Sequence, residues 1–332
     1  MYSEEDLTSA IKAGIFTDES VTAFRAHVEN NKSLPTIDEE QFRLITGFND
    51  IFVVIACTLL LVSVSWIGST IISDTAGALA LTATAWGLAE IFVLRRRMAL
   101  PAIVLMLTFV GGVLTVCISL FGKSDPVWFI VSGLITTAAA WLHWQRFKVP
   151  ITIAAGTAAA IGTIITLLLS TFTQLANWMP LLLLIAGVLA FSIAMHWDMA
   201  DTLRRTRKSD VAFWLHLLAA PLLVHPVFST LGMLEGRSNL LQATIVIALY
   251  IIMAMVSVMI DRRALMVSAL AYVLYVFTSL LKTYGIVSLN FALTGLVIGS
   301  ALLLLSAYWH NTRAGLICYV PAALRHRLPP LR

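Results

Sequence analysis

The chain has 332 residues, of which 59% are hydrophobic and only 12% are charged. Soluble globular domains carry about 25% charged residues, so half that share over this length excludes a water-soluble globule. The net charge of +4 would suit nucleic-acid binding in a soluble protein. Here the basic residues flank long apolar runs, and membrane topology explains them better. The composition therefore predicts a polytopic membrane protein.

A polar head, placed at residues 1–49, comes first. Ten of the eighteen acidic residues lie in positions 1–50. The pattern predicts two short amphipathic helices within residues 1–32, the first ending at Gly14 and the second beginning at Thr17. Such a hairpin is too small to bury a core alone. We expect it to dock on its own membrane helices, or on a second protomer or a partner protein.

A transmembrane domain follows, placed at residues 50–310. A spanning helix needs about 20 mainly apolar residues, and ten runs meet that rule. They are residues 50–71, 75–94, 99–121, 127–142, 149–171, 178–195, 211–230, 240–260, 264–281 and 286–307. Short links join them, so neighbouring helices must pack antiparallel. The predicted fold class is all-α, a bundle of about ten transmembrane helices with a small cytoplasmic helical head.

The Lys and Arg residues predict the orientation of this bundle. With the N-terminus inside, 19 of the 22 fall in the head, the inner links or the tail, and three fall in outer links: Lys123, Arg237 and Lys282. Basic residues are retained on the cytoplasmic side, so both chain ends are expected there. The tail, residues 311–332, mixes apolar and basic side chains and is expected to lie along the inner leaflet.

The seventh span, residues 211–230, is the most unusual. Pro221 and Pro226 each remove a helix hydrogen bond, which predicts a broken helix whose freed carbonyls find partners or line a wet cavity. His216 and His225 titrate near neutral pH, but nine positions place them on opposite helix faces. This span is our main candidate for a substrate or proton site. The alternative is a structural kink whose histidines bond to neighbouring helices.

Glu90 is a further candidate for a substrate or proton contact on the cytoplasmic side. Its alternative role is an interfacial carboxylate screened by the basic residues 95–97. The other acidic residues of the membrane domain fall in or beside links, which argues against a buried carboxylate relay. By residue type, His196, Asp198 and Asp201 could form a metal-binding trio, but residues two apart on a helix do not share a face. We therefore interpret them as parts of a solvated link.

Basic residues at two inner links are the candidates for contact with anionic lipid headgroups. They are Arg95, Arg96, Arg97, Arg204, Arg205, Arg207 and Lys208. The three cysteines are far apart without a CxxC pair, so neither a disulfide framework nor a zinc site is indicated. P-loop, HExxH and GxSxG motifs are absent from the sequence. We therefore expect no enzyme activity, no cofactor, no metal site and no nucleic-acid partner.

The run AEIFVLRRRMALP from Ala89 to Pro101, with Gly14-Ile-Phe-Thr17 in the head, carries a family resemblance. The chain resembles an uncharacterised family of bacterial inner-membrane proteins with many spans and a short N-terminal cytoplasmic helical segment. The match covers about the first third of the chain. It implies a multi-pass protein of the bacterial inner (cytoplasmic) membrane and carries no activity with it.

Two functions remain open from the sequence. The first is a small carrier or flippase for a solute or lipid, favoured by ten compact spans and a proline-broken seventh span. The second is a non-transporting scaffold or accessory subunit, favoured by the scarcity of intramembrane charge and by a head of docking size. Neither the substrate, the coupling ion nor the oligomeric state follows from the residues.

Overall fold

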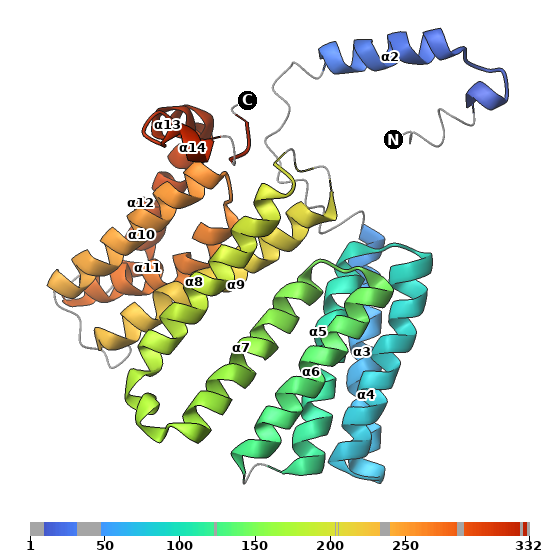
Figure 1. Ribbon diagram of the computed structural model, residues 1–332, viewed down its shortest axis with the longest axis vertical. Coiled ribbons are helices and arrows are strands. Elements are labelled where there is room, and N and C mark those ends of the chain that lie inside the picture. Colours follow the sequence, from blue (N-terminus) through green and yellow to red (C-terminus); the bar gives the residue numbers. More distant parts are fainter. Residues whose placement is uncertain are drawn as a thin grey trace. The chain divides into compact units, whose positions relative to one another are not determined.

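The computed structural model describes residues 10–31, 48–122, 125–202, 204, 206–232, 240–283, 289–325 and 328–330. Within these ranges every regular element is a helix (Figure 1). The chain divides into two compact units, Met1–Phe42 and Arg43–Arg332. The predicted all-α class is thereby confirmed.

In the first unit, helix α2 spans Asp18–Asn31. Thr17 and Ser20 cap its start reciprocally: the Ser20 backbone N–H donates to Thr17 Oγ1 at 3.2 Å, and the Thr17 N–H donates to Ser20 Oγ at 3.0 Å. Gly14 has a φ of +69°, the left-handed conformation that commonly ends a helix. Both features lie where the sequence predicts them. Most of the predicted first helix falls in residues 1–9, outside the described part of the chain.

In the second unit, ten helices follow the ten predicted apolar runs. They are α3 (Phe48–Ile71), α4 (Asp74–Ala89), α5 (Ala99–Phe121), α6 (Pro126–Phe147), α7 (Ile151–Thr171), α8 (Met179–Met199), α9 (Arg207–Thr230), α10 (Leu240–Ile260), α11 (Ala264–Thr283) and α12 (Asn290–Ala307). Four short elements complete it: the π-helix η1 (Glu90–Arg95), the 3₁₀-helix η2 (Thr173–Trp178), α13 (Trp309–Ile317) and α14 (Ala322–Arg325).

Eight helices of the described residues are long and apolar enough to cross a membrane: α3, α4 with η1, α5, α6, α7, η2 with α8, α9 and α10. The count becomes nine if α12 and α13, which are bent by 69°, form one span. Of the ten predicted spanning helices, eight are therefore supported by their length and apolar character. In α11 the apolar stretch that qualifies is shorter than a full span, residues 264–279. Eight such helices fit a multi-pass membrane protein.

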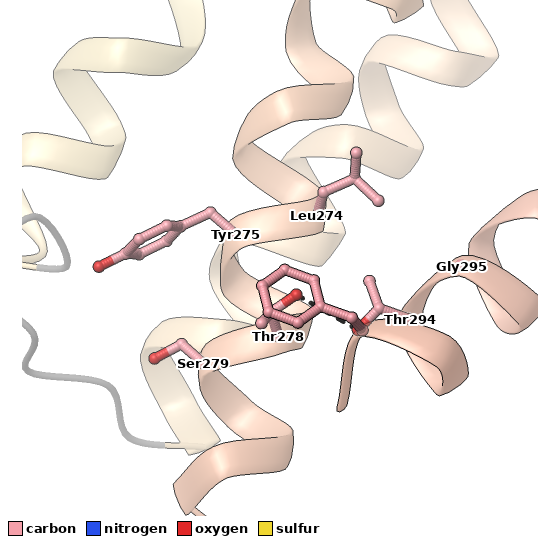
Figure 2. Close-up of a pocket in the computed structure, with 7 residues that line it drawn as sticks. Leu274, Tyr275, Thr278, Ser279, Thr294 and Gly295 are labelled. Atoms are coloured by element: carbon pink, nitrogen blue, oxygen red, sulfur yellow. Dashed lines mark hydrogen bonds between the residues drawn. The ribbon is translucent and has the colours of Figure 1, made fainter. Parts of the chain in front are cut away.

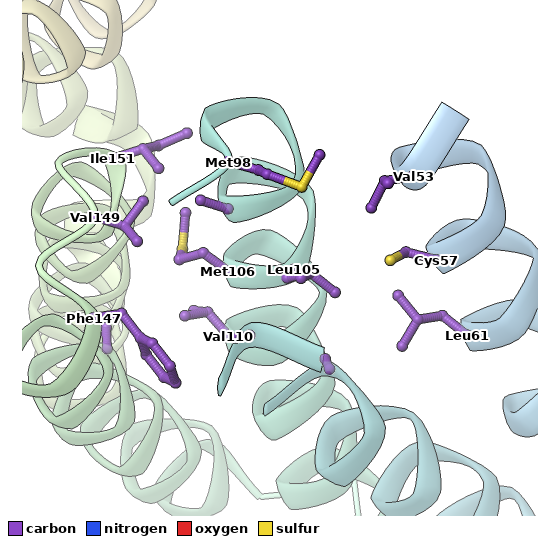
Figure 3. Close-up of a cluster of buried hydrophobic side chains, with 14 residues drawn as sticks. Val53, Cys57, Leu61, Met98, Leu105, Met106, Val110, Phe147, Val149 and Ile151 are labelled. Atoms are coloured by element: carbon purple, nitrogen blue, oxygen red, sulfur yellow. The ribbon is translucent and has the colours of Figure 1, made fainter. Parts of the chain in front are cut away.

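Large apolar side chains cover the outside of the second unit. Leu59, Trp66 and Leu303 are 65%, 72% and 73% exposed. The largest buried cluster joins α3 to α5 and to the turn between α6 and α7 (Figure 3). In it, Cys57 of α3 and Leu105 of α5 are almost fully buried. An exterior this apolar around a packed interior suits contact with lipid.

Helix α9 is the most enclosed of the candidate spans. Half of its most apolar window is buried, against 22–33% for the other seven. Buried side chains of α9 pack against α7 and α8 on one side and against α10 and α11 on another. This position makes α9 the central helix of the second half of the bundle.

The break expected at Pro221 and Pro226 is wrong, because α9 is one continuous helix through both prolines. Close packing by α8 is the physical reason. A Cβ added to Gly187 would lie 2.9 Å from the carbonyl carbon of Leu222, so α8 approaches the α9 backbone directly. Leu222 is the residue whose carbonyl Pro226 deprives of its usual helix partner. Helix α8 therefore packs directly on α9 where the proline has removed a backbone hydrogen bond.

Four of the links predicted to be cytoplasmic share a backbone feature. Arg97, Lys148, Arg204 and Asp261 have φ values of 53–59°, a left-handed conformation that costs a non-glycine residue roughly 1–2 kcal/mol. Each follows closely on the end of a long helix and turns the chain sharply. We call this end of the bundle, with these four links and the start of α13, the basic face.

Candidate functional site

A buried ion pair joins α8 to the α10–α11 link at the basic face. Asp198, in the last turn of α8, is 6% exposed, and Arg262 is 1% exposed. Arg262 Nε donates to Asp198 Oδ1 at 3.0 Å, and Nη2 donates to the same oxygen. Nη2 also donates to the hydroxyl and the carbonyl oxygen of Ser209, at 2.9 and 3.1 Å. One guanidinium thus connects α8, the start of α9 and the α10–α11 link.

His216 of α9 completes this group, which we call the Asp198 network (Asp198, Ser209, His216 and Arg262). Its imidazole is fully buried, and Nε2 lies 2.8 Å from Asp198 Oδ2. A carboxylate only accepts hydrogen bonds, so Nε2 carries the hydrogen and donates it. The ring of Phe191 stands edge-on to the imidazole with centroids 5.4 Å apart. The carboxylate is therefore shared between a guanidinium and an imidazole in a site closed to water.

Asp261 is the centre of a second group, which we call the Asp261 cluster. Trp309 Nε1 donates to its Oδ1 at 2.7 Å and Arg204 Nη1 donates to its Oδ2 at 3.2 Å, while Arg313 Nη1 lies 3.7 Å from Oδ2. Burial raises the pKa of Asp261, but Arg204, the Trp309 hydrogen bond and Arg313 outweigh it and hold that pKa below its ordinary value. The guanidinium of Arg263 lies 4.9 Å from the Trp309 ring centroid. These contacts hold α13 against the α10–α11 link.

Glu90 is placed by the π-helix η1, a conformation that often occurs at functional sites. It forms a two-pronged pair with Arg146 of α6, with distances of 2.9 and 2.8 Å. The two side chains are 32% and 55% exposed. The sequence predicts that the basic run 95–97 screens Glu90, whereas Arg146, in the last turn of α6, donates both of these hydrogen bonds. An exposed pair of this kind contributes little to stability.

His143 lies on α6 about one turn before Arg146, and our sequence analysis missed it. It is fully buried, and the rings of Trp86, Phe109 and Phe147 surround it with centroid distances of 4.5–6.0 Å. The predicted span ends at residue 142, because Trp144 and the basic residues Arg146 and Lys148 are typical of a membrane boundary. The helix instead continues to Phe147.

His225 lies nearer the other end of α9, and its Nδ1 is 3.2 Å from the Tyr272 hydroxyl of α11. The rings of Tyr272 and Tyr275 both meet Phe228 edge-on. Tyr275 also lines a half-open groove of about 480 Å³ between α11 and α12, where the hydroxyls of Thr278 and Thr294 are 3.3 Å apart (Figure 2). None of the described side chains that line this groove is charged; they are Leu274, Tyr275, Thr278, Ser279, Phe291, Thr294 and Gly295.

The predicted site residues therefore separate into three places. His216 and His225 contact different neighbouring helices, in keeping with their predicted opposite faces. Pro221 and Pro226 lie inside α9, and Glu90 is bonded elsewhere, to α6.

The interpretation of Asp198 as part of a solvated link is wrong, because Asp198 is buried and paired. Only Asp201 behaves as a link residue: its Oδ2 accepts hydrogen bonds from the backbone and hydroxyl of Thr206 at the start of α9. Asp198 and Arg262 are 64 positions apart, and each stands at the edge of an apolar run. The alternation of basic links places these two helix ends on the same side of the membrane, but a single sequence contains no signal that they are in contact.

The headgroup candidates also divide. Arg95, Arg96, Arg97, Arg207 and Lys208 are exposed. Arg204 differs, because its side chain is 12% exposed and bonded to Asp261. Arg205 lies outside the described residues. Among the residues searched, no three metal-binding side chains gather at one point.

No protein-family model, curated protein or solved structure matches the chain.

Proposed function

We propose that the protein is a small carrier or flippase of the bacterial inner membrane, with both chain ends in the cytoplasm. The supporting observation is that central helix α9 carries ionisable side chains at two depths, His216 and His225, each bonded to a different helix. Ionisable groups inside a span are costly and mark functional sites by default. Stability alone does not call for them, because apolar side chains often replace a buried ion pair without loss.

The two histidines also suggest what is carried. They are about 13 Å apart along a regular helix. His216 belongs to the Asp198 network near the basic face, whereas His225 lies nearer the other end of α9. His225 and its partner Tyr272 adjoin the groove through Phe228 and Tyr275. An apolar groove with a few hydroxyls suits the apolar part of a lipid or amphiphilic solute better than an inorganic ion. A phospholipid or similar amphiphile is therefore the substrate class to test.

The test is transport by the purified protein in liposomes. The wild type should accelerate the exchange of a fluorescent phospholipid between leaflets, and His225→Ala should reduce that rate several-fold while the yield of folded protein is unchanged. His196→Gln is the matched control, because His196 is exposed on α8 and lies outside the proposed path. An unchanged rate in His225→Ala would remove that residue from the site. A wild type that exchanges no labelled lipid or amphiphile would contradict the carrier function.

The head supports the alternative of a scaffold or accessory subunit. Ile15 and Phe16 are 70% and 48% exposed, and apolar side chains of this kind suit docking to a protein. A photoreactive amino acid at position 16 in living cells should then form adducts with a second chain. Adducts confined to its own chain would favour docking of the head within the molecule.

A further inference from the structure

One ring nitrogen of His216 has no hydrogen-bond partner. Nε2 donates to Asp198, which leaves Nδ1 with a lone pair. Nδ1 is buried and bonds to none of the described residues. Buried polar atoms without a partner are rare in folded proteins, and each calls for an explanation. Nδ1 is thus an open position for a proton inside the Asp198 network.

The charges that face this imidazole come from three elements. Asp198 of α8 favours a positive imidazole, whereas Arg262 of the α10–α11 link and Arg204 of the α8–α9 link oppose it. Asp210, on α9 itself, interacts electrostatically with Arg262. While His216 is neutral, the charges of Asp198 and Arg262 cancel. A proton on Nδ1 would leave an uncompensated positive charge in a buried site, which is unfavourable as long as the network stays closed.

We propose that His216 binds a proton from water at Nδ1, and that this releases Arg262 from Asp198 and opens the basic face. The bond formed is N–H, and the proton returns to water when the network closes. An open state solvates the added charge and binds the proton more tightly, so a lower pH favours it. Arg262 bonds to Asp198 and Ser209, and its carbonyl accepts from Ser257. Its release removes the bonds that its side chain makes from the α10–α11 link to α8 and α9, while Arg204 still holds Asp261 of that link.

This inference rests on the proposed carrier function in one respect, which is that the proton would be the coupling ion of the carrier. Proton uptake and opening are measurable without any transported substrate. Transport and opening can therefore fail independently, and the two measurements tell them apart.

Proton uptake is measured on the full chain in detergent micelles by ¹⁵N NMR of labelled histidines, with His216→Gln to assign the signal. We expect His216 to change from the neutral Nε2–H form at pH 8 to the doubly protonated form by pH 5. A His216 signal that stays neutral, or stays protonated, across this range would overturn the proposal.

Opening is measured by the distance between spin labels at positions 199 and 267, in a chain whose three cysteines are replaced by alanine. Met199 ends α8 and Val267 lies in the first turn of α11, and both are exposed. We expect the distance to increase by several ångströms from pH 8 to pH 5, and His216→Gln to abolish the increase. The exposed control His196→Gln should retain it.

Arg262→Gln provides a second check if His216→Gln does not fold. Without the guanidinium the link has lost its bonds to Asp198 and Ser209, so the long distance is expected at both pH values. The proposed opening would be refuted if the distance between the spin labels did not change with pH in the wild type, or still changed with pH in His216→Gln.

Discussion

At the scale of single residues, the buried pair of Asp198 and Arg262 is stable only while both partners are present. Removing two charges from water is costly, and their attraction repays that cost only with good geometry and further hydrogen bonds. Ser209 and His216 supply those further bonds here. The network is therefore sensitive to the loss of any one member.

We predict that Asp198→Asn lowers the free energy of unfolding by about 3–5 kcal/mol, because it leaves Arg262 buried without a countercharge. Glu90→Gln breaks an exposed pair and should have a much smaller effect. Unfolding in mixed micelles with increasing SDS, followed by circular dichroism, measures both variants. Equal losses in the two would contradict the burial of Asp198.

Asp261 should make the attachment of α13 to the α10–α11 link sensitive to pH. Its folded pKa is held below the ordinary 3.8, so its stabilising effect is present above pH 3.8 and is lost as the pH falls through the folded value. A spin label on exposed Cys318, just after α13, should become mobile at such low pH. Asp261→Asn should show the mobile spectrum already at neutral pH. An immobile label in that variant would show that the Asp261 cluster does not hold α13.

At the scale of helices, close approach between α8 and α9 depends on one small residue. Gly187 faces the α9 backbone at Leu222 and Leu223, where even a methyl group would be within 2.9 Å of main-chain atoms. Backbone cannot move aside as the end of a flexible side chain can. The close packing of α8 on α9 beside Pro226 therefore depends on this glycine.

Gly187→Ala should lower the free energy of unfolding by about 1–3 kcal/mol through overpacking. Gly162→Ala in α7 is the matched control, because nothing lies within 4 Å of its added Cβ. That control should be neutral or stabilising by up to about 1 kcal/mol, since alanine favours a helix over glycine. Thermal unfolding in detergent compares the two. A stabilised Gly187→Ala variant would refute the close approach.

The helices themselves are well predicted by apolar runs, and their ends less so. The predicted runs 99–121 and 240–260 coincide with α5 and α10. The run 127–142 is too short, because α6 continues until Arg146 reaches Glu90. The run 211–230 starts late, because Arg207 to Asp210 already form the first turn of α9. In both cases a polar residue in the added turn contacts another element, Arg146 with Glu90 and Ser209 with Arg262, and hydropathy along one chain contains no record of those contacts.

At the scale of the whole molecule, the alternation of basic links predicts which helix ends belong together. The bonds agree for two of the inner links and the tail: Asp198 with Arg262, Arg204 with Asp261, and Trp309 with Asp261. Hydropathy also predicts the helices, because the backbone N–H and C=O groups of an apolar run in lipid must form hydrogen bonds within the run. It does not predict the 69° bend between α12 and α13, which depends on partners for Trp309 and Arg313 from the α10–α11 link.

The membrane orientation has a direct reporter in Cys318. Cys57 and Cys117 are buried and Cys318 is exposed, so an impermeant maleimide should react at Cys318. We expect labelling in inverted membrane vesicles and none in intact cells, because the tail is predicted to be cytoplasmic. Labelling of intact cells would reverse the orientation. A Cys318→Ser variant gives the background.

The four left-handed residues of the basic face bear on how this protein could be engineered. Arg97, Lys148, Arg204 and Asp261 each hold a strained backbone conformation that asparagine or glycine would adopt more easily. Arg97 is exposed, whereas Lys148 is half-buried and its Nζ donates to Gln145 Oε1 at 3.1 Å, so thermostabilising design should begin with Arg97. At Arg204 and Asp261 a substitution by glycine or asparagine would also remove the ionic contacts that hold α13 in place. Relief of backbone strain at these two positions would therefore release the C-terminal helix.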